Sequence, residues 1–121
     1  MGMEIETRLS DQLARFLDLA SSETKLTAAN MANIDTPGYR TVGMDFETEM
    51  SEALSGLDQG QAAKPVRIQM TDGLIARPDG NNVSLDRESL NLAEAQLKFK
   101  TGVALLRQEN QRILDAIHAD K

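Results

Sequence analysis

The stretch LAEAQLKFKTGVALLRQENQRILDAI, residues 92–117, decides the fold of this 121-residue chain. One face of it follows alternating steps of four and three residues: Leu92, Gln96, Phe99, Val103, Leu106, Asn110, Ile113 and Ile117. This spacing is typical of a helix that packs along another helix. We expect these residues to form a coiled-coil seam whose apolar members lie in a core. Because one helix cannot bury such a seam alone, the sequence requires a helical partner.

Two polar residues interrupt this seam, and a glycine lies beside it in the same helix. Asn110 lies between two apolar seam residues, so we predict that it is buried and sets the register of the helix pair. The alternative is a slightly rotated seam that leaves Asn110 and Gln96 in solvent. Gly102 lies inside the same helix, where glycine costs about 1 kcal/mol relative to alanine. Its presence indicates close approach by a neighbouring helix.

Composition excludes several classes of protein. The net charge is −6 without a basic stripe, which argues against nucleic acid and anionic membranes as partners. No apolar run reaches the roughly 20 residues of a membrane span, and we expect no secretory signal peptide. The absence of cysteine excludes disulfides and thiolate metal sites. With a lone His118 and no catalytic constellation, we expect no enzyme, cofactor or metal site.

A second amphipathic helix is predicted for residues 4–35. Ile5, Leu9, Leu13 and Phe16 recur at three- and four-residue steps. The sequence Thr36-Pro37-Gly38-Tyr39 ends this helix, because the residue before a proline is disfavoured in the α region and Pro-Gly suits a type II turn.

The middle segment, residues 36–82, is predicted to be a turn followed by irregular structure. A short helix fits 44–54, and alternation through Val66, Ile68 and Met70 is a weak strand signal. Turn signals at 72–73 and 78–80 leave room for a small β-hairpin. A helix over 85–118 completes a mainly α chain, a single domain in which long N- and C-terminal helices pair as a coiled coil around a loop-rich middle.

Two stretches of this sequence resemble a known family. Residues 28–40, AANMANIDTPGYR, resemble the N-terminal motif of bacterial flagellar rod, hook and related axial proteins, and the matching positions are Asn30, Ala32, Asn33, Thr36, Gly38, Tyr39 and Arg40. Residues 81–88, NNVSLDRE, resemble the beginning of the C-terminal helix in the proximal members of the flagellar basal-body rod protein family. This second stretch, followed by Leu92, Ala93 and Leu97, most resembles the FlgB family, and the short middle supports that resemblance. The similarly sized FlgC family is the alternative.

This resemblance implies a structural role. Members of the family are expected to pack their terminal helices into a helical tube, the rod, that transmits torque from motor to hook. It further implies self-association, contacts with other rod proteins and the rod-base adapter, and a periplasmic location in the basal body. Export would use the flagellar type III apparatus without a cleaved signal.

Some roles stay open at the level of sequence. Asn30 and Asn33 fit either a local helix cap or a contact between subunits, and the resemblance favours fixing the helix-to-turn geometry. Tyr39 fits either packing against its own turn or an anchor between subunits. The alternative function is a soluble helical adaptor or chaperone-like module that offers the same seam to a foreign helix.

Overall fold

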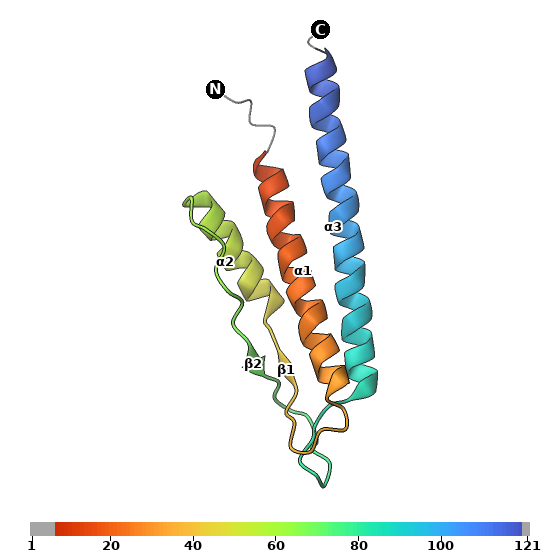
Figure 1. Cartoon of the computed structure of the whole chain (residues 1–121). Helices are drawn as coiled ribbons and strands as arrows, with labels where there is room; N and C mark the ends of the chain where they lie inside the picture. The colour runs from red at the N-terminus through yellow and green to blue at the C-terminus, as the bar shows by residue number, and fades with distance from the viewer. Residues whose placement is uncertain (1–6, 120–121) are drawn as a thin grey trace.

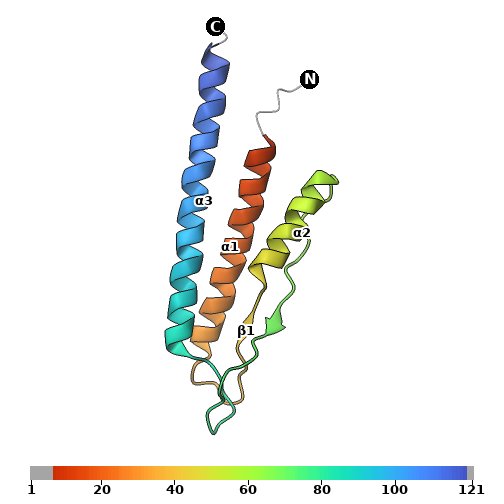
Figure 2. The same ribbon diagram turned by 180° about the vertical axis from the view of Figure 1, so that it is seen from behind.

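The computed structural model describes residues 7–119, and three helices dominate it. The elements are α1 (Arg8–Ala32), β1 (Val42–Gly43), α2 (Phe46–Asp58), β2 (Gln69–Met70) and α3 (Leu85–Ala119). α1 and α3 lie side by side in opposite directions, and α2 lies on the other side of α1 (Figure 1). The view from behind shows the loop that follows α1 and the loop that precedes α3 together at one end (Figure 2). The terminal helices therefore pair as the fold prediction requires.

Each helix begins at a polar side chain that accepts a hydrogen bond from the first turn. Thr7 accepts from the Ser10 amide at 3.0 Å at the start of α1. Asp45 accepts from the Thr48 amide at 3.1 Å at the start of α2. Ser84 Oγ accepts from the Arg87 amide at 3.3 Å at the start of α3. Such caps satisfy amides that have no partner within the helix, which explains why the helices begin at these residues.

The face that α3 turns toward α1 is narrow, with small residues in its middle and a glutamate at each end. Its buried members recur every seven residues: Glu88, Ala95, Gly102 and Glu109. A Cβ atom added at Gly102 would lie 2.7 Å from Leu17 Cδ2 of α1. The two helices therefore approach each other at Gly102 more closely than a larger residue permits, as the glycine predicted.

The predicted seam is rotated in the structure. Asn110 and Gln96 are exposed, and Phe99 remains 42% exposed at the edge of the interface. The prediction that Asn110 is buried is therefore wrong for this helix pair. Because α1 packs against the line through Ala95 and Gly102, the larger apolar residues lie to one side of it. Half-buried positions on that side include Leu92, Val103, Leu106, Ile113 and Ile117.

α2 is attached to α1 through aromatic packing. The rings of Phe46 and Phe16 meet edge to face with centroids 5.6 Å apart. Lys98 of α3 reaches the same site, with its Nζ 3.9 Å from the Phe46 centroid. An ammonium over an aromatic face is attractive, so Phe46 links all three helices at one point.

The middle segment contains the predicted short helix, with bounds later than 44–54. The strand pair is antiparallel, with Val42 opposite Met70 and Gly43 opposite Gln69. Its strands flank α2 in the sequence, so the pair is not a tight hairpin closed by the turns at 72–73 or 78–80. The Asn30 side chain hydrogen-bonds both the carbonyl and the amide of Val42. β1 is therefore attached to α1, and β2 pairs with it.

The terminal helices differ little from their predicted bounds. α1 ends at Ala32, three residues before the predicted end at residue 35, because Asn33 caps it. Residues 4–6 of that prediction, with Ile5, lie outside the described residues. α3 ends one residue beyond the predicted 118. None of the helices in residues 7–119 carries an apolar stretch long enough to cross a bilayer.

Candidate functional site

The chain's loops are joined by a buried group of polar side chains, here called the turn network: Asn30, Tyr39, Asn81, Asn82 and Glu88. At its centre Asn30 is 1% exposed in the last turns of α1. Its Nδ2 donates to the Val42 carbonyl at 2.8 Å and to Glu88 Oε1 at 3.1 Å. Its Oδ1 accepts from the Tyr39 hydroxyl at 3.0 Å and the Val42 amide at 3.1 Å. One amide thereby uses its full bonding capacity to join α1, β1 and α3.

Two further asparagines hold the loop that follows α1. Asn81 is fully buried, and its Nδ2 donates to the carbonyls of Asn33, Ile34 and Thr36 at 2.8–3.1 Å. Asn82 Oδ1 accepts from the Thr41 amide at 2.6 Å. Buried carbonyls and amides are costly unless paired. These two side chains therefore fix the backbone geometry between α1 and β1.

The other residues of the AANMANIDTPGYR motif act locally or face solvent. Asn33 Nδ2 donates to the Ala29 carbonyl at 2.8 Å, and its Oδ1 accepts from Thr36 Oγ1 at 3.0 Å. Gly38 has φ +76°, a conformation that favours glycine, and its amide donates to the Asp79 carbonyl at 2.9 Å. Ala32, Thr36 and Arg40 are exposed. The structure thus brings Asn30 and Tyr39 together and leaves the exposed members outside the network.

Glu88 is the only ionisable side chain of the turn network besides Tyr39. It is 1% exposed in the first turns of α3, where the helix dipole favours a negative charge. Burial, and then the negative charge of Glu88, raise the pKa of Tyr39 above its ordinary 10.0. Within the described residues, Glu88 Oε2 is buried without a hydrogen-bond partner. A carboxylate oxygen in that condition is a strong unused acceptor.

A second polar contact joins α1 and α3 at the opposite end. The Thr7 hydroxyl donates to Glu109 Oε2 at 2.6 Å, and Arg112 Nε donates to Glu109 Oε1 at 2.7 Å. Hydrogen bonds from Arg112 and then Thr7 lower the pKa of Glu109 from 4.5 to about 2. Glu109 is therefore ionised at neutral pH and ties the α1 cap to α3.

Large apolar side chains lie in solvent on the faces of α3 that α1 does not cover. Leu90 is 61% exposed and Leu97 is 66% exposed, and Leu85, Leu105 and Leu114 are each 44% exposed or more. Leu90 and Leu97 are seven residues apart and share one face of α3, and exposed apolar residues grouped on one face are typical of a protein contact site. Among residues 7–119 no three His, Asp or Glu side chains are grouped so that they could hold a metal ion. The arrangement suits binding to other polypeptides.

Sequence reasoning missed Glu88, Asn81, Asn82 and Glu109 as residues that organise the fold. Asn81, Asn82 and Glu88 belong to the quoted NNVSLDRE stretch, whose likeness to a helix start signalled their importance without their contacts. Glu109 gave no signal, because its partner Thr7 is about a hundred positions away in the sequence.

Comparison with known proteins gives consistent relatives. A scan of family models finds no match. The flagellar basal body rod protein FlgB of Borrelia hermsii is 32% identical over 110 residues, which cover 74% of this chain and 80% of the relative. FlgB of Cereibacter sphaeroides is 29% identical, with 94% of this chain and 99% of the relative covered. FlgB of Salmonella typhimurium is 29% identical, with coverage of 84% and 86%.

These matches extend over both terminal helices and the middle segment, at comparable length in each relative. The resemblance to the FlgB family is thereby confirmed. The chain belongs to the FlgB family of flagellar basal body rod proteins.

Proposed function

We propose that this chain is a structural subunit of the proximal flagellar rod and acts as a single rod-protein domain. Its terminal helices assemble with those of neighbouring subunits into a helical tube that transmits torque. Its partners are other rod proteins and the rod-base adapter, which it reaches in the periplasm after export through the flagellar type III apparatus. The role is mechanical, with no chemical step.

One observation carries this proposal: the apolar residues Leu90 and Leu97 of α3 are exposed on a face turned away from α1. Burying a leucine side chain contributes about 1.5–3 kcal/mol relative to leaving it in water. A helix with apolar residues on two faces can contact its own α1 and a neighbouring subunit together. Subunits of a tube need contacts of this kind on more than one side.

The turn network supports the mechanical role. It fixes the loop end through buried hydrogen bonds, so the two long helices keep a defined relative position. Densely packed interiors deform little under load. A subunit that transmits torque needs this stiffness where its helices are connected.

The test is deletion of the gene in its motile bacterium, followed by complementation. The wild-type chain is expected to restore rods and swimming. A Leu90→Gln/Leu97→Gln double variant is expected to fold, because both side chains are exposed, yet to fail in rod assembly. Gln108→Ala, also on an exposed part of α3, is the matched control and should complement fully. Normal swimming after deletion would contradict the proposal.

A further inference from the structure

A groove of about 400 Å³ lies between the second half of α1, the strand pair and the first turns of α3. This size is within the range of about 300–1,000 Å³ typical of ligand-binding pockets. We call it the Glu88 groove. Its charged and polar lining includes Glu23, Thr27, Asp72, Arg87, Glu88 and Asn91. Three carboxylates and one guanidinium line the groove, and Lys98 pairs with one of the carboxylates, Glu23, so a small excess of negative charge remains and favours a cation.

The carboxylate of Glu88 is incompletely satisfied. Oε1 accepts one hydrogen bond, from Asn30 at 3.1 Å, while Oε2 has no partner among residues 7–119. No lysine or arginine of the described chain forms an ion pair with it, whereas Glu23 of the same groove pairs with Lys98 at 3.1 Å. Since a buried charge is costly unless paired, Glu88 suits a cationic donor from another molecule.

Arginine is the residue best fitted to a carboxylate at an interface, because its planar fork donates two parallel hydrogen bonds. Most arginines of this chain already donate to an acceptor: Arg8, Arg15, Arg67, Arg77 and Arg112. Arg87 lines the groove itself. Arg40 and Arg107 are the remaining two, and both are exposed.

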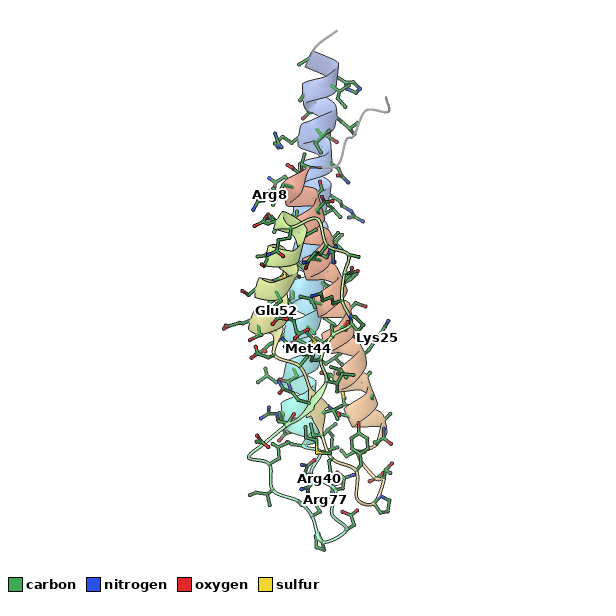
Figure 3. The ribbon with its side chains drawn as sticks, turned by 90° about the vertical axis from the view of Figure 1, so that its left-hand side faces the viewer. Arg8, Lys25, Arg40, Met44, Glu52 and Arg77 are labelled. Carbon is green, nitrogen blue, oxygen red and sulfur yellow. The ribbon has the colours of Figure 1, made fainter. Side chains whose placement is uncertain are left out.

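Arg40 differs from Arg107 in how its backbone is held. The Tyr39 hydroxyl donates to Asn30, and the Thr41 amide donates to Asn82 at 2.6 Å, so both neighbours of Arg40 are fixed by the turn network. The Arg40 side chain has no partner within the described residues, and it lies at the loop end beyond Met44, which lines the groove (Figure 3). Because the backbone at Arg40 is already fixed, binding has to order only the arginine side chain and not the loop that carries it.

We propose that Arg40 of one copy of this chain enters the Glu88 groove of a second copy, moves aside the side chains that cover Glu88, and donates to Glu88 Oε2. This inference rests on the proposed function, since it names one contact of the assembling subunits. The contact joins two different surfaces, a cation at the loop end and a groove on the side. It is therefore heterologous, and a heterologous contact builds an open helical assembly when the rotation from copy to copy does not close a ring.

A double-mutant cycle on self-association of the purified full chain tests the contact. The variants are Glu88→Gln, Arg40→Gln and the two combined, and sedimentation equilibrium measures the association constant of each. Each single variant is expected to weaken association about tenfold or more, and the double variant no further than either single one. Glu94→Gln and Arg107→Gln, both at exposed sites of α3, are matched controls and should associate like the wild type.

Independent losses that multiply in the double variant, single variants that associate normally, or a wild-type chain that stays monomeric would each overturn the contact. Circular dichroism checks folding, and a glutamine in place of Glu88 still offers an oxygen to Asn30. If Glu88→Gln does not fold, the test is the association constant of the exposed Arg40→Gln variant compared with that of Arg107→Gln. Equal constants would overturn the contact. Complementation of the deletion strain separates the two proposals. If the chain is required for rods but its Arg40→Gln variant associates normally, the proposed rod function stands and only this contact is overturned.

Discussion

The side-chain amide of Asn30 donates to the carboxylate of Glu88 over 3.1 Å, which links the end of the first long helix to the beginning of the last. Both side chains are 1% exposed. The hydrogen bond joins residues 58 positions apart, so it holds the chain together where its loops cross. The pair therefore helps to fix how α1 and α3 are joined at the loop end.

Replacement of Asn30 by alanine is expected to destabilise the folded chain by about 2–4 kcal/mol, because it leaves Glu88 and the Val42 backbone without their partners. Urea unfolding followed by circular dichroism measures the change. Asn33→Ala is the matched control: its cap is exposed, and it should cost about 1 kcal/mol or less. Equal losses in the two variants would show that the turn network contributes nothing beyond local capping.

Replacement of Gly102 by leucine is expected to destabilise the α1–α3 pair by about 1–3 kcal/mol. A Cβ atom at this position already lies 2.7 Å from Leu17 Cδ2, so a larger side chain forces the helices apart. Thermal unfolding measures the loss. Ala104→Leu, at an exposed position of α3, adds the same side chain in solvent and should change stability by less than about 0.5 kcal/mol. A fully stable Gly102→Leu variant would contradict the observed close approach.

Glu109 is expected to make stability fall in acid. Its pKa in the folded chain is about 2, below the ordinary 4.5, so the folded state holds the charged form more tightly than the unfolded state does. The contribution is therefore complete above pH 4.5 and is lost as the pH falls toward 2. Denaturation midpoints of the wild type and Glu109→Gln should differ by a constant amount from pH 5 to 7 and converge near pH 2. A difference that does not change with pH would mean that the Glu109 charge is not involved.

Tyr39 is expected to titrate above 10.0, because burial and the charge of Glu88 both disfavour the phenolate. The chain has one tyrosine and no tryptophan, so absorbance at 295 nm reports this group alone. Glu88→Gln removes the second cause and should lower the pKa of Tyr39 toward 10.0, while Glu94→Gln should leave it unchanged. An identical titration in wild type and Glu88→Gln would show that Glu88 carries no charge beside Tyr39.

The sequence predicted the helices, whose signals repeat at short range. It did not predict contacts between residues that are far apart in the chain. The α3 helix was predicted to within one residue of its end, because its apolar repeat and its polar first turn are local signals. The orientation of that helix was predicted less well, because hydrophobic size selected Phe99 and Leu106 for the centre of the seam. Close packing placed Ala95 and Gly102 there instead.

The hydrogen-bond partners of the buried polar side chains could be identified only in the structure. Asn30 was identified by resemblance, yet its bonds to Val42 and Glu88 follow only from the crossing of two loops. The pairing of β1 with β2 across α2 has the same cause. No periodicity in a single sequence encodes contacts of this kind, because each joins one residue to one distant partner.

Cysteine cross-linking in intact basal bodies tests the central claim, that the chain is a rod subunit whose outer α3 face contacts its neighbours. The chain has no native cysteine, so a single Leu97→Cys variant presents one thiol on that exposed face. Ala95→Cys, at a fully buried position facing α1, is the control. Rod assembly predicts that purified basal bodies contain the chain and that a cross-linker with one thiol-reactive and one photoreactive end joins the Leu97→Cys variant, but not the Ala95→Cys variant, to another copy or to other rod proteins. Basal bodies that lack the chain, or a Leu97→Cys variant that remains uncross-linked within them, would contradict the claim.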